Sequence, residues 1–155
     1  MYKVLIVDDE EVIARQIAEV IPWMENGFTV IGIETNSTRA VERVLELNPN
    51  VVFTDLRMPN MDGHLFMKTV REHGLDTEFV MLSAFGTFED AKEFFQQEGF
   101  DYLLKPLQLQ EVSLVLEKLA CKLSKKYPMK AEIEDETLNP AFIALTEYLK
   151  SCYYE

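Results

Sequence analysis

The sequence predicts an α/β fold in which a doubly wound, five-stranded parallel sheet is covered by five helices. Short apolar runs rich in β-branched and aromatic residues alternate with longer segments of helical periodicity, which is typical of a sheet built from βαβ units. Several runs are apolar without interruption, as expected for strands that are buried on both faces. The expected strands cover residues 4–7, 29–34, 51–54, 78–83 and 100–104.

Residues that start and stop helices divide the segments between these strands. The second helix is expected to begin near Asn36 and the fourth near Thr87, while Gly74 and Gly99 end the third and the fourth. The spacing of apolar residues also predicts which side of a helix faces the sheet. In the first, second and fifth helices these inward-facing residues are Ile13, Ile17, Val20, Ile21, Val41, Val44, Leu45, Val112, Leu116, Leu119 and Leu123.

Three parts follow one another along the chain. Residues 1–123 contain all the strands and helices of the main domain. Residues 124–139 mix charges of both signs with few large apolar residues, which indicates a linker. Residues 140–155 contain a short helical pattern that would be marginal in isolation, so we expect it to dock on another part of the protein.

Composition indicates a soluble globular protein. The chain has 155 residues, of which 48% are hydrophobic and 27% are charged. The net charge of −12 argues against direct binding to nucleic acid, because that affinity depends on clustered Lys and Arg. No apolar run is long enough to span a membrane, so we expect a cytoplasmic protein without an anchor. Cys121 and Cys152 lack metal-site spacing and are expected to stay reduced.

Charged residues follow three of the predicted strands directly. Asp8 and Asp9 follow the first strand, Asp55 follows the third and Lys105 follows the fifth. Ligands of open parallel sheets bind outside the carboxyl ends of the strands, so we expect these side chains to meet in one pocket. Carboxylates in such a place require a positive partner. Three acids and one lysine therefore predict a bound divalent cation and a negatively charged group.

The transfer of a phosphoryl group suits this set of residues. An aspartate can be the nucleophile and form an aspartyl phosphate, and Asp55 is the candidate because it stands alone after a central strand. Asp8 and Asp9 would hold Mg²⁺, which takes few protein oxygens and keeps several waters. Lys105 would pair with a phosphoryl oxygen, and the hydroxyl of Ser83, at the end of the fourth strand, would bind another.

Four motifs, in order along the chain, resemble the receiver domain of two-component response regulators. They are the pair Asp8 and Asp9, the segment 54–59 with Gly63, the pair Ser83 and Ala84, and the segment 102–106. The resemblance covers about residues 1–123. It implies a flavodoxin-like sheet in the order 2-1-3-4-5, for which receivers are a standard example, with the acids at the switch point between strands 1 and 3.

The same resemblance implies how the acids would work. Asp55 would be the phosphoacceptor and would receive its phosphoryl group from a sensor histidine kinase. Asp9, Asp55 and the backbone carbonyl of Arg57 would bind Mg²⁺ directly, whereas Asp8 would act mainly through metal-bound water.

The resemblance also implies a switch. Ser83 and Tyr102 would be the switch pair, and the peptide bond between Lys105 and Pro106 would be cis. Phosphorylation is expected to alter the face made by the fourth helix, the fifth strand and the fifth helix, and to promote a homodimer there. One of two neighbouring residues of the fourth helix, Phe94 or Phe95, would contribute apolar contact at that interface.

Three further stretches give a finer resemblance. Residues 21–28 and 85–92 are similar to the receivers that precede AraC-type helix-turn-helix domains, and residues 142–149 are similar to the opening helix of such a domain. By this resemblance the chain is the receiver half of a longer transcriptional regulator, which would contact DNA only through an output domain missing from this sequence. A stand-alone phosphorelay receiver that acts through protein contacts is the alternative.

Functions of two other classes match the sequence less well. An aspartate-nucleophile phosphohydrolase would carry a second aspartate two residues after the nucleophile, but Arg57 stands there, so we expect no enzyme. A nucleotide-binding domain would need a glycine-rich phosphate loop, and the six glycines form no such pattern. His64 and His73 are expected on the surface of the third helix rather than at a metal.

Overall fold

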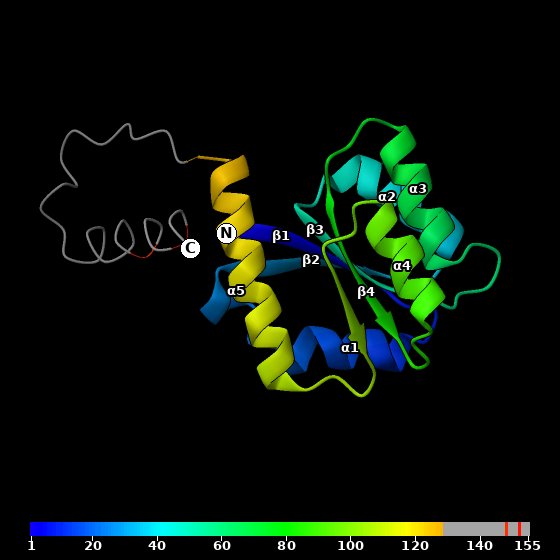
Figure 1. The fold of residues 1–155 in the computed structure, drawn as a ribbon, viewed down its shortest axis with the longest axis horizontal. Coiled ribbons are helices and arrows are strands. Elements are labelled where there is room, and N and C mark those ends of the chain that lie inside the picture. The colour runs from blue at the N-terminus through cyan, green and yellow to red at the C-terminus, as the bar shows by residue number, and fades with distance from the viewer. Residues whose placement is uncertain (129–147, 149–151, 153–155) are drawn as a thin grey trace, which may run out of the picture.

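A parallel sheet of five strands forms the centre of the described part of the chain (Figure 1). The computed structural model describes residues 1–128, Tyr148 and Cys152. The strands are β1 (Tyr2–Val7), β2 (Phe28–Glu34), β3 (Val51–Asp55), β4 (Glu78–Ser83) and β5 (Asp101–Leu104). They lie in the order β2-β1-β3-β4-β5, which confirms the predicted doubly wound fold.

Helices cover both faces of the sheet (Figure 1). They are α1 (Glu11–Val20), α2 (Ser37–Leu47), α3 (Gly63–Glu72), α4 (Phe88–Gln96) and α5 (Leu109–Lys126), with a 3-10 turn, η1 (Met24–Asn26), before β2. One layer consists of α1 and α5, and the other of α2, α3 and α4. Side chains of β1 alternate between the layers: Val4 and Ile6 pack with α1 and α5, whereas Leu5 and Val7 pack with the opposite layer. This two-sided burial explains why β1 is apolar without interruption from Val4 to Val7.

The loops after β3 and β4 lead into helices that begin with a polar cap. At the start of α3, Asp62 Oδ1 accepts a hydrogen bond from the backbone N–H of Leu65 at 2.8 Å. At the start of α4, Thr87 Oγ1 accepts one from the backbone N–H of Asp90 at 3.1 Å. Each cap satisfies an amide of the first turn and so fixes where the helix begins. The predicted start of the fourth helix near Thr87 is therefore confirmed.

Three predictions about side-chain burial are wrong. Val20 and Leu45, which were expected to face the core, are 61% and 42% exposed. The buried stripes of their helices run instead through Ala14 and Ala40, small residues that a pattern of large apolar side chains does not reveal. His64, expected at the surface, is only 6% exposed because its ring lies against α4.

Helix α5 continues to Lys126, past the predicted domain boundary at residue 123. Two lysines of its last turns pair with the buried carboxylate of Glu78: Lys122 Nζ lies 2.9 Å from Glu78 Oε2, and Lys126 Nζ lies 3.2 Å from Glu78 Oε1. The charges at this end of α5 therefore anchor the helix to β4. Most of the predicted linker and final helix lies outside the described residues. None of the described helices, α5 included, combines the length and the apolar character needed to cross a membrane.

Candidate functional site

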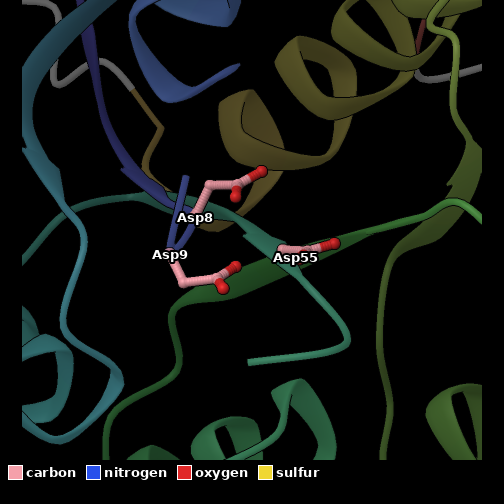
Figure 2. A group of neighbouring side chains, drawn as sticks. All are labelled: Asp8, Asp9 and Asp55. Carbon is pink, nitrogen blue, oxygen red and sulfur yellow. The ribbon is translucent and has the colours of Figure 1, made fainter. Parts of the chain in front are cut away.

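Three carboxylates meet at the carboxyl ends of β1 and β3 (Figure 2). Asp8 and Asp9 follow β1, and Asp55 is the last residue of β3. One oxygen of each side chain lies within 4.8 Å of an oxygen of the other two. The two strands are hydrogen-bonded neighbours in register up to Val7 and Thr54, which brings the acids to the same level of the sheet. We call these three residues the acidic cluster.

Lys105, which follows β5, reaches the same place. Its ammonium group donates a hydrogen bond to Asp8 Oδ2 at 2.8 Å and lies 3.2 Å from Asp55 Oδ1. The peptide bond between Lys105 and Pro106 is cis. The structure thus brings together all four of the charged residues that the sequence places at strand ends.

Burial and charge shift the pKa values of two of these groups. The pKa of Asp55 is raised, first because the carboxyl is buried; Lys105 opposes this shift, and the negative charges of Asp8 and Asp9 add to it. For Lys105, burial alone would lower the pKa, but the hydrogen bond to Asp8 and the charges of Asp55 and Asp8 outweigh burial and raise it. The lysine is therefore charged at neutral pH, and the negative charge on Asp55 is only partly compensated.

The acidic cluster has the composition of a Mg²⁺ site, because Mg²⁺ prefers carboxylate and carbonyl oxygens. Asp9 is exposed, so solvent can reach its oxygens. Asp8 is fully buried and already accepts hydrogen bonds from Lys105 and, at 3.0 Å, from the backbone N–H of Glu10. Three carboxylates beside one ammonium group leave an excess of negative charge, which a divalent cation would neutralise.

The two predicted switch residues, at the end of β4 and within β5, form no hydrogen bond with Asp55 among the described interactions. Ser83 Oγ donates a hydrogen bond to the backbone carbonyl of Phe85 at 2.8 Å and accepts one from its N–H at 3.2 Å. Tyr102 packs its ring 5.9 Å, between centroids, from that of Phe94, and its hydroxyl is buried without a hydrogen-bond partner among the described residues. The Ser83 hydroxyl is thus bound to the loop after β4 in this conformation, and that of Tyr102 has no bond to hold it within the described part of the chain.

Gly63, the first residue of α3, allows the helix to begin against β3. A Cβ atom at this position would lie 2.9 Å from the backbone carbonyl oxygen of Asp55 and 2.6 Å from Met81 Sδ. The backbone N–H of Gly63 also donates a hydrogen bond to the carbonyl of Leu56 at 2.8 Å. A larger residue at 63 would therefore push the helix away from the residue that carries the candidate phosphoacceptor.

Another charged group next to the site was not predicted. Arg57 Nη2 lies 3.0 Å from Asp90 Oδ2 on α4. On the other side of the same carboxylate, His64 Nε2 lies 3.6 Å from Asp90 Oδ1, and it lies 3.7 Å from Glu93 Oε2. Arg57 and Asp90 are 33 residues apart in the sequence, so no local sequence pattern connects them. Only the tertiary structure, in which α4 meets both α3 and the loop after β3, reveals this cluster.

Comparison with known proteins identifies the family. A family model for the response regulator receiver domain matches residues 4–117, which include the acidic cluster and Lys105. The chain belongs to the response regulator receiver domains. Receiver domains of response regulators are signalling domains of two-component systems rather than enzymes, so the expectation that this chain is no enzyme is confirmed.

Relatives and solved structures agree with this assignment. The chain is 37% identical over 126 residues to YesN, an uncharacterized transcriptional regulatory protein of Bacillus subtilis, covering 81% of this chain and 34% of YesN. It is 32% identical over 119 residues to the transcriptional regulatory protein HptR of Staphylococcus aureus, covering 77% of this chain and 46% of HptR. This receiver therefore spans less than half the length of either regulator.

Two solved structures support the fold. The receiver domain of AraT, a response regulator from Geobacillus stearothermophilus, is 35% identical, with a TM-score of 0.74 and coverage of 81% of this chain and 97% of that one. A structure of the CheX-CheY-BeF3-Mg²⁺ complex from Borrelia burgdorferi matches with 25% identity, a TM-score of 0.69 and coverage of 77% and 89%. The finer likeness to receivers of AraC-type regulators stays a prediction.

Proposed function

We propose that this receiver domain accepts a phosphoryl group on Asp55 from a sensor histidine kinase, with Mg²⁺ at the acidic cluster, and thereby switches a transcriptional output. The proposal rests on the groups that surround Asp55. Its carboxylate ends a central strand, lies within 4.8 Å of the oxygens of Asp8 and Asp9, and is 3.2 Å from the ammonium group of Lys105. A nucleophile in this position has acids for a cation and a positive charge for phosphoryl oxygens within reach.

The proposed transfer is a single displacement at phosphorus. An oxygen of Asp55 attacks the phosphorus of a phosphohistidine, the phosphorus–nitrogen bond breaks, and the imidazole nitrogen keeps the electron pair and takes up a proton. Asp9, Asp55 and the backbone carbonyl of Arg57 would hold Mg²⁺ directly, and Asp8 would hold it through water. When bound, the cation would neutralise charge on the phosphoryl oxygens.

Lys105 would change partners during the transfer. Its ammonium group is 2.8 Å from Asp8 Oδ2 and 3.2 Å from Asp55 Oδ1 before phosphorylation. A phosphoryl group on Asp55 would add oxygens near the Lys105 ammonium group, and Mg²⁺ would compensate the charge of Asp8. The lysine could then pair with a phosphoryl oxygen without leaving a buried carboxylate unpaired.

Ser83 and Tyr102 would transmit the change. In the described conformation Ser83 is bound to the backbone of Phe85, so its turn toward a phosphoryl oxygen would release the loop that leads into α4. Tyr102, whose hydroxyl has no hydrogen-bond partner among the described residues, would then move into the space that is vacated. The loop and the β5 side chain would thus act as one two-state element.

The face that would respond is formed by α4, β5 and α5. Phe95, Leu104 and Leu114 are 50%, 52% and 57% exposed on these three elements, and we propose that a homodimer forms there on phosphorylation. Phe94 cannot contribute, as it is completely buried against Tyr102. A dimer would bring two output domains together, and DNA half-sites are commonly read by paired domains.

The transcriptional part of the proposal is supported by the relatives and by charge. YesN and HptR carry the words transcriptional regulatory protein in their names and are more than twice as long as the matched segment. The net charge of −12 makes this chain itself a poor ligand for DNA, so an output domain outside this sequence would make that contact. We propose a cytoplasmic location with a sensor kinase as the partner.

Phosphorylation can be tested without knowing the kinase. The protein is incubated with acetyl phosphate and Mg²⁺, and the intact mass is measured. We expect one added phosphoryl group in the wild type, none in Asp55→Asn and none when EDTA removes the metal. Equal labelling of Asp55→Asn would refute the assignment of the phosphoacceptor, and labelling that persists in EDTA would refute the role of Mg²⁺.

A further inference from the structure

The side chain of Arg57 is held by helix α4, although its backbone belongs to the loop that follows Asp55. The Arg57 side chain is 66% exposed, and its ion pair with Asp90 has an Nη2 to Oδ2 distance of 3.0 Å. Among the described residues this is the only ion pair or hydrogen bond of that side chain. The position of a long, flexible and permanently charged group therefore depends on a single carboxylate.

Asp90 itself is fixed in place. It lies in the first turn of α4, where its backbone N–H donates to the capping hydroxyl of Thr87 at 3.1 Å. Its side chain is 14% exposed and lies between Arg57 and the buried ring of His64, whose Nε2 is 3.6 Å from Asp90 Oδ1. Both ring nitrogens of His64 are buried without a hydrogen-bond partner, so Asp90 and Glu93 supply the polar surface that this ring meets. The Asp90 carboxylate is thus largely buried and confined between the two side chains.

The acidic cluster offers Arg57 a second place to bind. Arg57 is two residues from Asp55 in the chain, and the cluster has three carboxylates but only one lysine. A guanidinium binds carboxylates through two parallel hydrogen bonds and carries the same sign of charge as a metal ion. If Arg57 turned to the cluster, it would neutralise the carboxylates and compete with a divalent cation.

We propose that Asp90 is a positioning residue that holds the Arg57 guanidinium away from the acidic cluster and so keeps the cluster open to a divalent cation. The proposal deepens the function above and rests on it, since it assumes that the cluster binds Mg²⁺. Asp90 also compensates the charge of Arg57, which would otherwise repel the cation. Through both effects, loss of the Asp90 charge would lower the affinity of the acidic cluster for the cation.

The arrangement also connects cation binding to helix α4. Asp90 belongs to α4, whereas Arg57 belongs to the loop after β3. Movement of the first turn of α4 would release Arg57 and lower the affinity for the cation. By linkage, a bound cation favours the position of α4 in which Asp90 retains Arg57.

The test is a Mg²⁺ titration by isothermal calorimetry at low ionic strength, where charge effects are least screened. Asp90→Asn keeps the size of the side chain and removes its charge. We expect its dissociation constant for Mg²⁺ to rise about two- to fivefold, as for the loss of a partly exposed ion pair. Glu93→Gln is the matched control, because it removes the same charge from the same helix and also faces His64, but has no contact with Arg57 among those described. Binding by Glu93→Gln should stay at the wild-type level.

A double variant separates competition by Arg57 from a general structural effect. In Arg57→Ala/Asp90→Asn the competing guanidinium is gone, so Mg²⁺ should bind more tightly than it does to Asp90→Asn. Asp90→Glu, which keeps the charge, should also bind more tightly than Asp90→Asn. The proposal is overturned if Asp90→Asn binds like the wild type, if the double variant is as weak as Asp90→Asn, or if Glu93→Gln is weakened equally. A wild type that binds no Mg²⁺ would instead refute the proposed function.

Discussion

The ammonium group of Lys105 lies 2.8 Å from Asp8, whose carboxylate is completely buried. Leaving a charge buried without a partner costs more free energy than most side-chain contacts contribute, so this pair stabilises the fold as well as serving the site. The second partner of Asp8, the backbone N–H of Glu10 at 3.0 Å, cannot supply the missing positive charge. Lys105 therefore has a structural role before any phosphoryl group arrives.

The first prediction concerns the loss of this lysine. In Lys105→Ala the charge of Asp8 loses its partner, and we expect the free energy of unfolding in EDTA to fall by about 2 kcal/mol. Adding Mg²⁺ should restore part of the loss, because a cation bound only to the folded state supplies the missing positive charge. Urea unfolding with EDTA and with Mg²⁺ measures both effects. Lys118→Ala, at an exposed position of α5, is the control and should change little; unchanged stability of Lys105→Ala in EDTA would contradict the structural role.

The second prediction concerns pH and Asp55. Its pKa in the folded protein is raised, mainly by burial, so the folded state binds more protons than the unfolded chain between the ordinary and the raised pKa. The stability contributed by this group therefore falls as the pH rises through that interval. In EDTA, Asp55→Asn should have a higher Tm than the wild type at neutral pH, and the difference should shrink as the pH falls below the ordinary pKa of an aspartate. A lower Tm for the variant at neutral pH would contradict the sign of the shift.

The third prediction concerns the start of α3. In Gly63→Ala the new Cβ would lie 2.9 Å from the carbonyl oxygen of Asp55, a backbone atom that cannot turn aside as the Met81 side chain can. We expect a loss of about 1–3 kcal/mol of stability from overpacking, together with weaker binding of Mg²⁺ because Asp55 is displaced. Chemical unfolding and calorimetric titration measure the two effects. Lys68→Ala, at an exposed position of the same helix, should leave both unchanged, and a Gly63→Ala variant that matches it would contradict the tight approach.

The fourth prediction concerns the dimer. Beryllofluoride with Mg²⁺ mimics a phosphoryl group on the acceptor, and we expect it to shift the protein from monomer to dimer in sedimentation experiments. Phe95→Ser removes an exposed apolar side chain from α4, so it should weaken the dimer without changing the response of Asp55 to acetyl phosphate. A mass distribution that stays unchanged across micromolar concentrations would rule out output through dimerisation of this face.

The strand-end residues could be predicted from sequence because each depends on a local pattern. An uninterrupted apolar run marks a strand of a covered parallel sheet, and the topology then brings the ends of β1, β3 and β5 to one edge. The meeting of Asp8, Asp9 and Asp55 follows from these two facts, whereas Lys105 also needs a long side chain, because β4 lies between β5 and β3. Their roles in phosphorylation remain proposals, because roles depend on a cation and a phosphoryl group.

Other features depend on packing that no local pattern contains. The buried stripes of α1 and α2 run through Ala14 and Ala40, so the larger side chains of Val20 and Leu45 were misleading. The burial of His64 requires the contact between α3 and α4, and the ion pair of Arg57 with Asp90 requires the loop after β3 to meet α4. At the end of α5, Lys126 lies inside the predicted linker and Lys122 just before it, yet both pair with the buried Glu78 of β4, which is 44 residues from Lys122 in the sequence.

The central claim is that Asp55 carries the phosphoryl group, and chemical trapping tests it most directly. After incubation with acetyl phosphate and Mg²⁺, borohydride reduces an aspartyl phosphate to homoserine and releases phosphate, and peptide mass spectrometry then locates the homoserine. We predict homoserine at position 55 alone, and none in EDTA. Homoserine at Asp8 or Asp9, or its absence from a protein whose intact mass shows a phosphoryl group, would contradict the account.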